Sequence, residues 1–278
     1  MKLVNGFDLM EFAKNHHYVL PAFNTTNLEM TYAIANGLMA ANLPGYIQIS
    51  SNNLRLSNPD IIAKISKDAV KKSETPIGLH LDHGKSFEDV KACLDAGFTS
   101  IMIDMSHLPY EENIRECRRA AEYCHFYGVP IEAELGALRG KEEDIVNEAE
   151  CKTNPDMVAE FVERTGCDTL AVSVGNVHGL CLNPQIDLPL LEKINQVSSV
   201  PLVLHGGSGI PKEVIWEAKK YGLIKINYGS DLRKEFIRTF GEAYEQNHNE
   251  HDVIHLSIAA VENVSRKAQE LVTMINEH

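Results

Sequence analysis

The chain has 278 residues, of which 44% are hydrophobic and 23% charged, so it can bury a large core and is neither fibrous nor low in complexity. Its net charge is −13, and no basic cluster exceeds short pairs such as Lys71-Lys72, which argues against binding to DNA or RNA. No apolar run reaches the roughly 18 residues that cross a membrane, and residues 1–6 lack the apolar segment of a signal peptide. Six cysteines without C-x-x-C spacing indicate reduced thiols, so we expect a cytoplasmic protein that binds neither nucleic acid nor membrane.

Short apolar runs bounded by turn residues recur along the chain, and their lengths are those of strands buried on both faces. In chain order they predict strands at Tyr18–Phe23, Gly45–Ser50, Ile77–Leu81, Ser100–Ile103, Pro130–Leu135, Thr169–Val174, Val200–Leu204 and Leu223–Ile226. Stretches with helical periodicity lie between them, for example Glu29–Ala40, Phe87–Ala96, Glu112–Tyr127 and Asp156–Thr165. Asn154-Pro155 marks a helix start, and Gly97, Gly128 and Gly166 mark helix ends.

Strands that alternate with helices imply a parallel sheet, and eight of them in a chain of this length predict an α/β fold, the (β/α)8 TIM barrel. An open doubly wound sheet is the alternative, but it would need a glycine-rich phosphate turn after the first strand. Residues 24–27 read Asn-Thr-Thr-Asn at that point. With no Pro-, Gly- or Ser-rich linker and no internal repeat, we expect a single domain over residues 1–278, with extra helices after Ser230.

Polar side chains collect at or near the carboxyl ends of the predicted strands, the end of the barrel where TIM-barrel enzymes place their active sites. They are Asn24, Ser50, Asp82, His83, Asp104, Glu132, Glu134, His178, His205 and Asn227. His83, His178 and His205 would converge as three imidazoles with an open fourth position, the arrangement of a catalytic zinc site. Spacing alone leaves open whether each histidine hydrogen-bonds a neighbouring loop instead. His80 and His107 are expected to be core or supporting residues and not metal ligands.

Two further segments have the composition of ligand-binding loops. The run 205–209, His-Gly-Gly-Ser-Gly, follows the seventh strand, where barrels commonly bind phosphate, and Ser230 would add a second hydroxyl. The run 141–144, Lys-Glu-Glu-Asp, follows the fifth strand and is flanked by glycines. It is either a solvated charged face or a flexible lid that carries a catalytic base to the substrate.

Four ordered motifs together resemble those of the class II, zinc-dependent ketose-bisphosphate aldolases. They are Leu79–Gly84, Glu132–Gly136, Gly175–Gly179 and Leu204–Gly209, and the resemblance runs from about Tyr18 to Leu232. The segments 106–109, 146–150 and 170–172 look more like the tagatose-bisphosphate branch of the family. Asp82-His83-Gly84 and the run 205–207 look equally like the fructose-bisphosphate branch.

The resemblance implies a retro-aldol cleavage of a ketose 1-phosphate or 1,6-bisphosphate to dihydroxyacetone phosphate and an aldehyde, with a tagatose-1,6-bisphosphate-like substrate favoured. His83, His178 and His205 would hold Zn²⁺, with Asp104 and Glu134 as an alternative metal position or supporting groups. Asp82 would handle the proton on the C4 oxygen as that bond breaks. Glu142 would exchange the proton on dihydroxyacetone phosphate, or Glu143 would do so if the loop alignment slips by one. The substrate would be bound by Asn24, Ser50, Gly179, Gly206, Gly207, Ser208, Asn227 and Ser230, with Na⁺ or K⁺ assisting at the phosphate.

The chain departs from the family pattern at three places. Arg139-Gly140 stands where family members usually have Gly-Gly before the acidic loop. After Asn227 the chain has Tyr228-Gly229-Ser230, where family members usually have a small residue or an aspartate before a threonine. The family's Asp-Pro-Arg segment, whose arginine reaches the distal phosphate from a neighbouring subunit, is absent, and residues 249–252 read Asn-Glu-His-Asp. Because a bidentate guanidinium is lost, we expect an aldehyde product unlike glyceraldehyde 3-phosphate, for example one without a phosphate.

Two other functions remain to be weighed. An imine-forming aldolase would use Lys225 on the eighth strand, but it would leave the three histidines without a role. A non-catalytic companion subunit is the second, and the presence of Asp82, three histidines and Glu142 argues against it. The resemblance also implies a homodimer or homotetramer with a sugar-phosphate substrate.

Overall fold

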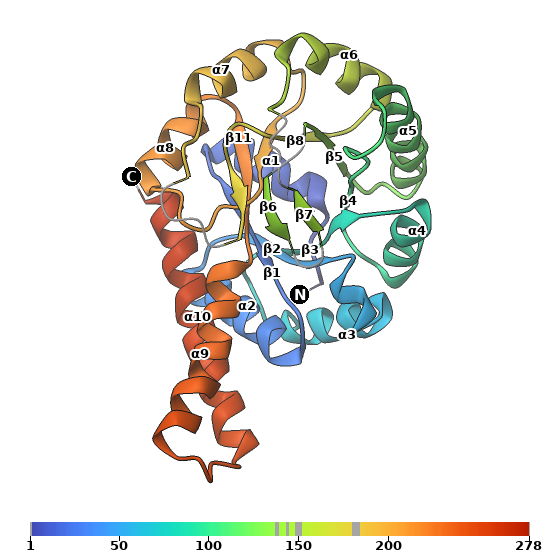
Figure 1. The fold of residues 1–278 in the computed structure, drawn as a ribbon. Helices are drawn as coiled ribbons and strands as arrows, with labels where there is room; N and C mark the ends of the chain where they lie inside the picture. The colour runs from blue at the N-terminus through green and yellow to red at the C-terminus, as the bar shows by residue number, and fades with distance from the viewer. Residues whose placement is uncertain (1, 137–138, 143–144, 148–151, 180–183, 278) are drawn as a thin grey trace.

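The structure is a computed structural model of the chain. It describes residues 2–136, 139–142, 145–147, 152–179 and 184–277 (Figure 1). For 139–142 and 145–147 the description is of the backbone.

Eight parallel strands close into a barrel, with the first strand hydrogen-bonded to the last. In sequence order they are β1 (Leu20–Asn24), β2 (Gly45–Ser50), β3 (Ile77–Gly84), β4 (Ser100–Ile103), β5 (Ile131–Leu135), β8 (Thr169–Val172), β10 (Leu202–Leu204) and β11 (Leu223–Tyr228). Each coincides with one of the predicted strands, with ends that differ by up to three residues. The (β/α)8 TIM barrel is therefore confirmed, since a closed parallel ring of eight strands wrapped by helices defines that fold.

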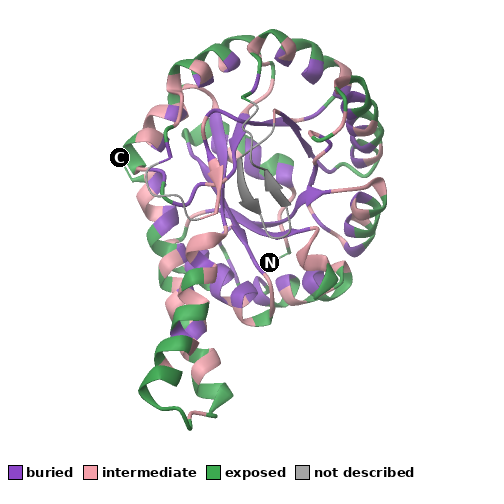
Figure 2. Ribbon diagram, in the orientation of Figure 1, coloured by how far each residue is buried: buried purple, intermediate pink, exposed green. Residues whose placement is uncertain are grey.

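Helices surround the barrel and cover the outward faces of its strands (Figures 1 and 2). They are α1 (Gly6–His16), α2 (Leu28–Ala41), α3 (Pro59–Ala69), α4 (Phe87–Ala96), α5 (Tyr110–Phe126), α6 (Pro155–Thr165), α7 (Leu188–Val197), α8 (Lys212–Lys220), α9 (Ser230–Gln246) and α10 (Val253–Asn276), with a short 3₁₀ helix at Asn53–Arg55. Asn154 caps the start of α6 through its side chain, and Gly166 ends it in a left-handed conformation, as predicted. No helix of the described residues is both long and apolar enough to span a membrane.

The expected extra helices after Ser230 are α9 and α10. They pack against each other, and α10 also packs on α2. Beyond that contact the two helices run on together as a hairpin that projects from the barrel, and most of its projecting surface is exposed (Figures 1 and 2).

The barrel interior is built differently from its outer face. Outward-facing strand residues join the main hydrophobic core under the helices, whereas Met102, Ala171 and Val203 form a separate small apolar cluster. Polar side chains occupy much of the remaining interior, among them His80 and Glu132, which are buried. Such groups are stable inside a protein only when they are hydrogen-bonded to one another.

A small second sheet lies outside the barrel, in the region for which the sequence left open a solvated charged face or a flexible lid. It consists of β6 (Arg139–Glu142) between β7 (Ile145–Asn147) and β9 (Val177–His178). Gly140 pairs with His178 in this sheet, so the segment before the acidic residues is extended backbone held beside a predicted metal ligand. Short polar strands that contain glycine carry little sequence signal, which is why this sheet was not predicted.

Candidate functional site

The three predicted histidines meet at the carboxyl end of the barrel. His83 comes from the end of β3, His178 from β9, and His205 follows β10. The ring of His83 lies 4.6 Å from that of His205 and 5.3 Å from that of His178, measured between ring centres. One nitrogen from each ring lies within 4.8 Å of the other two, so the three imidazoles can share one metal ion.

The side chain of His83 reaches this cluster through an unusual backbone conformation. Its φ is +46°, in the left-handed region, and the pairing of β3 with β4 shifts register between Leu81 and Gly84. A non-glycine residue in this region carries conformational strain, which proteins tend to retain where a side chain must be aimed. The strain therefore coincides with a residue that the sequence marks as a ligand.

A second group of possible ligands shares His83. It adds Asp104 and Glu134, and again one atom from each of the three residues lies within 4.8 Å of the others. His83 Nδ1 is 2.9 Å from Asp104 Oδ2 and 3.9 Å from Glu134 Oε2. Burial would raise the pKa of Asp104, but hydrogen bonds with His83 and Ser106 and the nearby His83 charge hold it well below its usual value.

His205 has the protonation and hydrogen bonding that a metal ligand requires. Its Nε2 lies 2.8 Å from Glu132 Oε1. Its Nδ1 is buried, makes no hydrogen bond within the described part of the chain, and lies 3.7 Å from Glu134 Oε2. Burial, followed by the charges of His83 and Lys225, moves the pKa of His205 well below its usual value and keeps the imidazole neutral, the form that binds metal. These imidazole and carboxylate donors fit Zn²⁺.

Asp82 is fully buried next to the histidine cluster and receives hydrogen bonds from three side-chain amides. Asn24 Nδ2 donates to its Oδ2 over 2.8 Å, Gln48 Nε2 to the same oxygen over 3.3 Å, and Asn227 Nδ2 to its Oδ1 over 2.9 Å. Burial raises the pKa of Asp82, but the nearby side chains of His83, His205 and Lys225 and the Asn24 hydrogen bond together lower it. The side chain is therefore an ionised carboxylate, positioned to accept a proton.

Lys225 connects this carboxylate to the histidine cluster. Its ammonium lies within the barrel and donates to Glu132 Oε2 over 2.9 Å and to Asn227 Oδ1 over 2.8 Å. Because Glu132 also contacts His205, a continuous polar chain joins His205 to Asp82. An ammonium used in this way argues against the imine alternative, which needs a neutral amine facing the substrate.

A pocket beside the cluster gathers most of the predicted substrate-binding residues. It is lined by Asn24, His178, Gly179, His205, Gly206, Ser208, Asn227, Gly229, Ser230 and Arg233. Two predicted residues are not part of this lining. Gly207 donates its backbone N–H to Asn227 O, and Ser50 lies within the barrel beside Asp82, its partner in the pairing of β2 with β3.

Several contributors to the site were not predicted. Gln48, Glu132 and Arg233 received no role, and Lys225 was considered only as an imine-forming residue. Arg233 lies in the first turn of α9 and lines the pocket next to Ser230 and Gly229. Glu132 and Lys225 could have been identified from the sequence, because each is a charged residue inside a mostly apolar strand.

The other predicted residues are placed as follows. His80 is buried and its Nδ1 lies 2.8 Å from Ser100 Oγ, in agreement with a core role. His107 is exposed and belongs to neither group of possible ligands. The backbone of Glu142 ends β6, but its side chain lies outside the description, as does all of Glu143.

We expect Gly206→Ala to destabilise the protein by about 1–3 kcal/mol and to weaken metal binding. Gly206 has a φ of +64°, and a Cβ there would lie 2.3 Å from Val177 O, in the strand that carries His178. Gly241→Ala is the matched control because it lies within helix α9 with open space around it, and we expect it to stabilise by about 0.5–1 kcal/mol. Urea unfolding and Zn²⁺ titration of both variants measure this, and equal stability of the two would contradict it.

Comparisons with known proteins agree with this geometry. The sequence profile of the family described as "Fructose-bisphosphate aldolase class-II" matches residues 4–278. A fructose-bisphosphate aldolase of Geobacillus stearothermophilus is 38% identical over 256 residues, which cover 91% of this chain and 89% of that protein. One from Staphylococcus epidermidis is 39% identical over 235 residues, covering 83% and 82% respectively. The crystal structure of the YdjI aldolase from Escherichia coli superimposes with a TM-score of 0.86 at 31% identity, over 99% of this chain and 97% of that one.

Proposed function

Because the chain belongs to the class-II fructose-bisphosphate aldolase family and is thus a carbon–carbon lyase, we propose that it is a zinc enzyme that reversibly cleaves a ketose phosphate. The products would be dihydroxyacetone phosphate and an aldehyde. The observation that carries the proposal is the placement of ionised Asp82 beside three convergent imidazoles. A tagatose-1,6-bisphosphate-like substrate is proposed first, and fructose 1,6-bisphosphate second, since relatives at 38–39% identity are named for it.

The proposed mechanism assigns proton transfers to residues of this chain. When bound by His83, His178 and His205, Zn²⁺ would act as a Lewis acid toward the ketone oxygen, where negative charge develops as the bond breaks. Asp82 would take the proton from the C4 hydroxyl as the C3–C4 bond breaks. The Asn24 and Asn227 amides hold both of its oxygens in place, so no reorientation is needed. Glu142 would then protonate C3, which becomes the hydroxymethyl carbon of dihydroxyacetone phosphate.

The phosphate of the substrate would occupy the pocket lined by Ser208, Ser230 and Arg233. Ser230 is the first residue of α9, so the phosphate would lie at a helix N-terminus, where backbone N–H groups and the helix dipole favour an anion. Arg233 would add a full positive charge in a protein whose net charge is −13. A bound Na⁺ or K⁺ would assist at the same place.

We expect Arg233→Gln to raise KM for the ketose phosphate and for dihydroxyacetone phosphate about tenfold or more, because one charge-assisted hydrogen bond to phosphate is lost. kcat should change much less, since the group binds the ground state and the transition state alike. Lys234→Gln is the control, because Lys234 is the exposed neighbour of Arg233 on the same helix. Steady-state kinetics that show equal effects of both substitutions would rule out a specific role for Arg233.

The proposed function is tested by following the loss of stereospecifically placed tritium from dihydroxyacetone phosphate. This half-reaction needs no aldehyde, so it tests the chemistry apart from the substrate specificity. We expect exchange that is abolished by EDTA and restored by Zn²⁺. No exchange in a folded, zinc-loaded sample would overturn the catalytic proposal and favour a companion subunit.

The alternative to both bisphosphates is a ketose 1-phosphate whose distal end lacks a phosphate, or which yields an aldehyde other than glyceraldehyde 3-phosphate. Residues 249–252, which replace the family's Asp-Pro-Arg segment, lie in the connection between α9 and α10 at the tip of the projecting hairpin (Figure 1). Cleavage of ketose 1-phosphates and the matching 1,6-bisphosphates should be compared directly. At least equal efficiency with fructose or tagatose 1,6-bisphosphate would refute this part of the proposal.

A homodimer or homotetramer formed through the projecting hairpin is also proposed. Its support is a set of exposed apolar side chains on α9 and α10, namely Ile237, Tyr244, Val253, Ile254 and Ile258. Sedimentation of the purified chain would give the subunit number, and a monomer at micromolar concentration would contradict the proposal.

A cytoplasmic location is also proposed. Its support is a set of buried free thiols, namely Cys93, Cys117, Cys124 and Cys167.

A further inference from the structure

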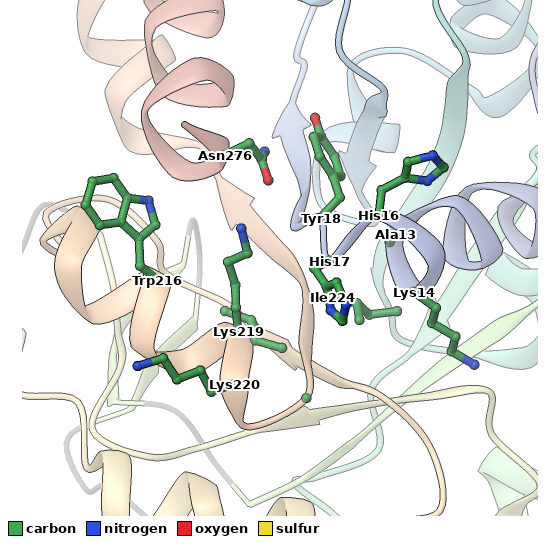
Figure 3. Close-up of a pocket in the computed structure, with 12 residues that line it drawn as sticks. Ala13, Lys14, His16, His17, Tyr18, Trp216, Lys219, Lys220, Ile224 and Asn276 are labelled. Carbon is green, nitrogen blue, oxygen red and sulfur yellow. The ribbon is translucent and has the colours of Figure 1, made fainter. Parts of the chain in front are cut away.

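A cavity of about 590 Å³ lies at the amino-terminal end of the barrel strands, away from the site described above. It is bounded by the end of α1, the start of β1, the end of α8, the start of β11 and Asn276 of α10 (Figure 3). Its volume lies within the range of pockets that bind small molecules and cofactors. None of the residues with a role in the proposed aldol reaction lines it.

The lining of this cavity is basic although the protein as a whole is acidic. Five of its 12 residues are lysine or histidine, and no aspartate or glutamate is among them: Lys14, His16, His17, Lys219 and Lys220. The complete chain has 39 acidic residues against 26 lysines and arginines. A lining that contains lysines and no carboxylate favours anions over cations as ligands.

Lys219 is the cation that faces the interior of the cavity. In Figure 3 its side chain extends into the space between Trp216 and Tyr18 toward Asn276, whereas Lys14 and Lys220 point outward at the margin. Lys220 is paired with Glu217 over 2.6 Å, but Lys219 has no hydrogen bond or ion pair to its ammonium among the residues that the structure describes. Burial lowers the pKa of Lys219 from its ordinary value, as expected for an ammonium partly removed from water without a counter-charge.

Helix stability accounts for part of this arrangement. Lys14 and His16 lie in the last turn of α1, and Lys219 and Lys220 in the last turn of α8, where positive charges favour the helix dipole. That effect is available to exposed side chains and does not require one ammonium to enter a cavity. It explains the basic margin, but it does not explain the inward position of Lys219 between two aromatic side chains.

We propose that this cavity is a binding site for a phosphorylated small molecule with a planar apolar part, such as a nucleoside monophosphate. Lys219 would contact the phosphate, with His17 and the basic margin adding to the attraction. Trp216, Tyr18 and Ile224 would contact the planar part, since aromatic and aliphatic surfaces line the same space. The site is separate from the proposed phosphate pocket at Ser208 and Arg233.

The chain provides its own reporter for a test, because Trp216 is its single tryptophan. Tryptophan fluorescence of the full-length protein should be titrated with AMP, ribose 5-phosphate and adenosine at constant ionic strength. We expect a saturable change with AMP, weaker binding of ribose 5-phosphate and the weakest binding of adenosine. Lys219→Met should weaken AMP binding about tenfold, and Lys219→Arg should retain it, because a charge-assisted contact is lost in the first and kept in the second.

Two control variants test whether the fluorescence change arises from AMP bound in this cavity. Lys220→Met alters the neighbouring exposed lysine and should change AMP affinity less than about twofold, and Arg233→Gln should leave the tryptophan response unchanged. Stabilisation of the folded protein by AMP in a thermal melt provides a second readout for Lys219→Met. No saturable change with AMP, or equal affinity in Lys219→Met and the unaltered protein, would overturn this proposal. Neither result bears on the aldolase proposal, because no enzyme activity is measured.

Discussion

Replacing Asp82 with asparagine is expected to lower kcat for ketose phosphate cleavage by about a hundred- to ten-thousand-fold, the usual loss on removal of a general base. The asparagine side chain is nearly the same size, but it cannot accept the proton from the C4 hydroxyl. It would also turn an amide toward the donors of Asn24, Gln48 or Asn227, which now point at carboxylate oxygens. Steady-state cleavage kinetics measure the effect, with a thermal melt to verify folding.

The same variant separates the two proton transfers of the proposed mechanism. Proton exchange on dihydroxyacetone phosphate does not involve the C4 hydroxyl, so Asp82→Asn should retain most of it. Glu142→Gln should lose both exchange and cleavage, because the proposed role of Glu142 is proton transfer at the carbon common to the two reactions. If Asp82→Asn loses exchange as fully as cleavage, the separate assignment of the two residues is wrong.

Lys225→Met is expected to cost about 3–5 kcal/mol of unfolding free energy, the usual result of breaking a buried ion pair on one side. Glu132 is 2% exposed, and without the ammonium its negative charge would have no compensating partner apart from His205. The substitution would also release Asn227 Oδ1, and with it the orientation of the amide that donates to Asp82. Urea unfolding monitored by circular dichroism measures the loss.

Two further variants separate the charge from the shape of the side chain. Lys225→Met combined with Glu132→Gln removes both charges and should recover a large part of the lost stability, though not the activity. Lys220→Met breaks a pair of exposed side chains and should alter stability little, because water screens such pairs. If the double variant is as unstable as Lys225→Met alone, packing and not the ion pair accounts for the effect.

The sequence was sufficient to predict the barrel because the strands are short, mostly apolar runs bounded by turn residues. A strand such as Gly45–Ser50 is buried on both faces, so its composition identifies it without knowledge of its neighbours. The convergence of the three histidines and Asp82 could be predicted for a related reason, since they lie at the ends of such runs or a few residues beyond, and the fold brings all strand ends to one rim.

The polar interior could not be predicted in the same way. Lys225 and Glu132 are 93 positions apart in the chain, and no local pattern records that two strands bring them within 2.9 Å. The cavity at the amino-terminal end of the barrel could not be predicted either, because it forms only where the ends of three helices meet in the folded protein. Glu132 was expected among the polar residues at the strand ends, but its contact with His205 depends on the closed barrel, which residue spacing does not determine.

The left-handed backbone of His83 has a consequence for how the proposed acid–base group and metal ligand are related. Side chains alternate between the two faces of a strand, so residues 82 and 83 would normally point to opposite sides of the barrel wall. The reversed φ at His83 brings both to the same side, with His83 Nε2 3.9 Å from Asp82 Oδ1. A single peptide bond then sets the spacing of these two groups, independently of any loop. Inserting one residue between them would separate the two groups, whereas an insertion earlier in β3 would move both together and keep their spacing.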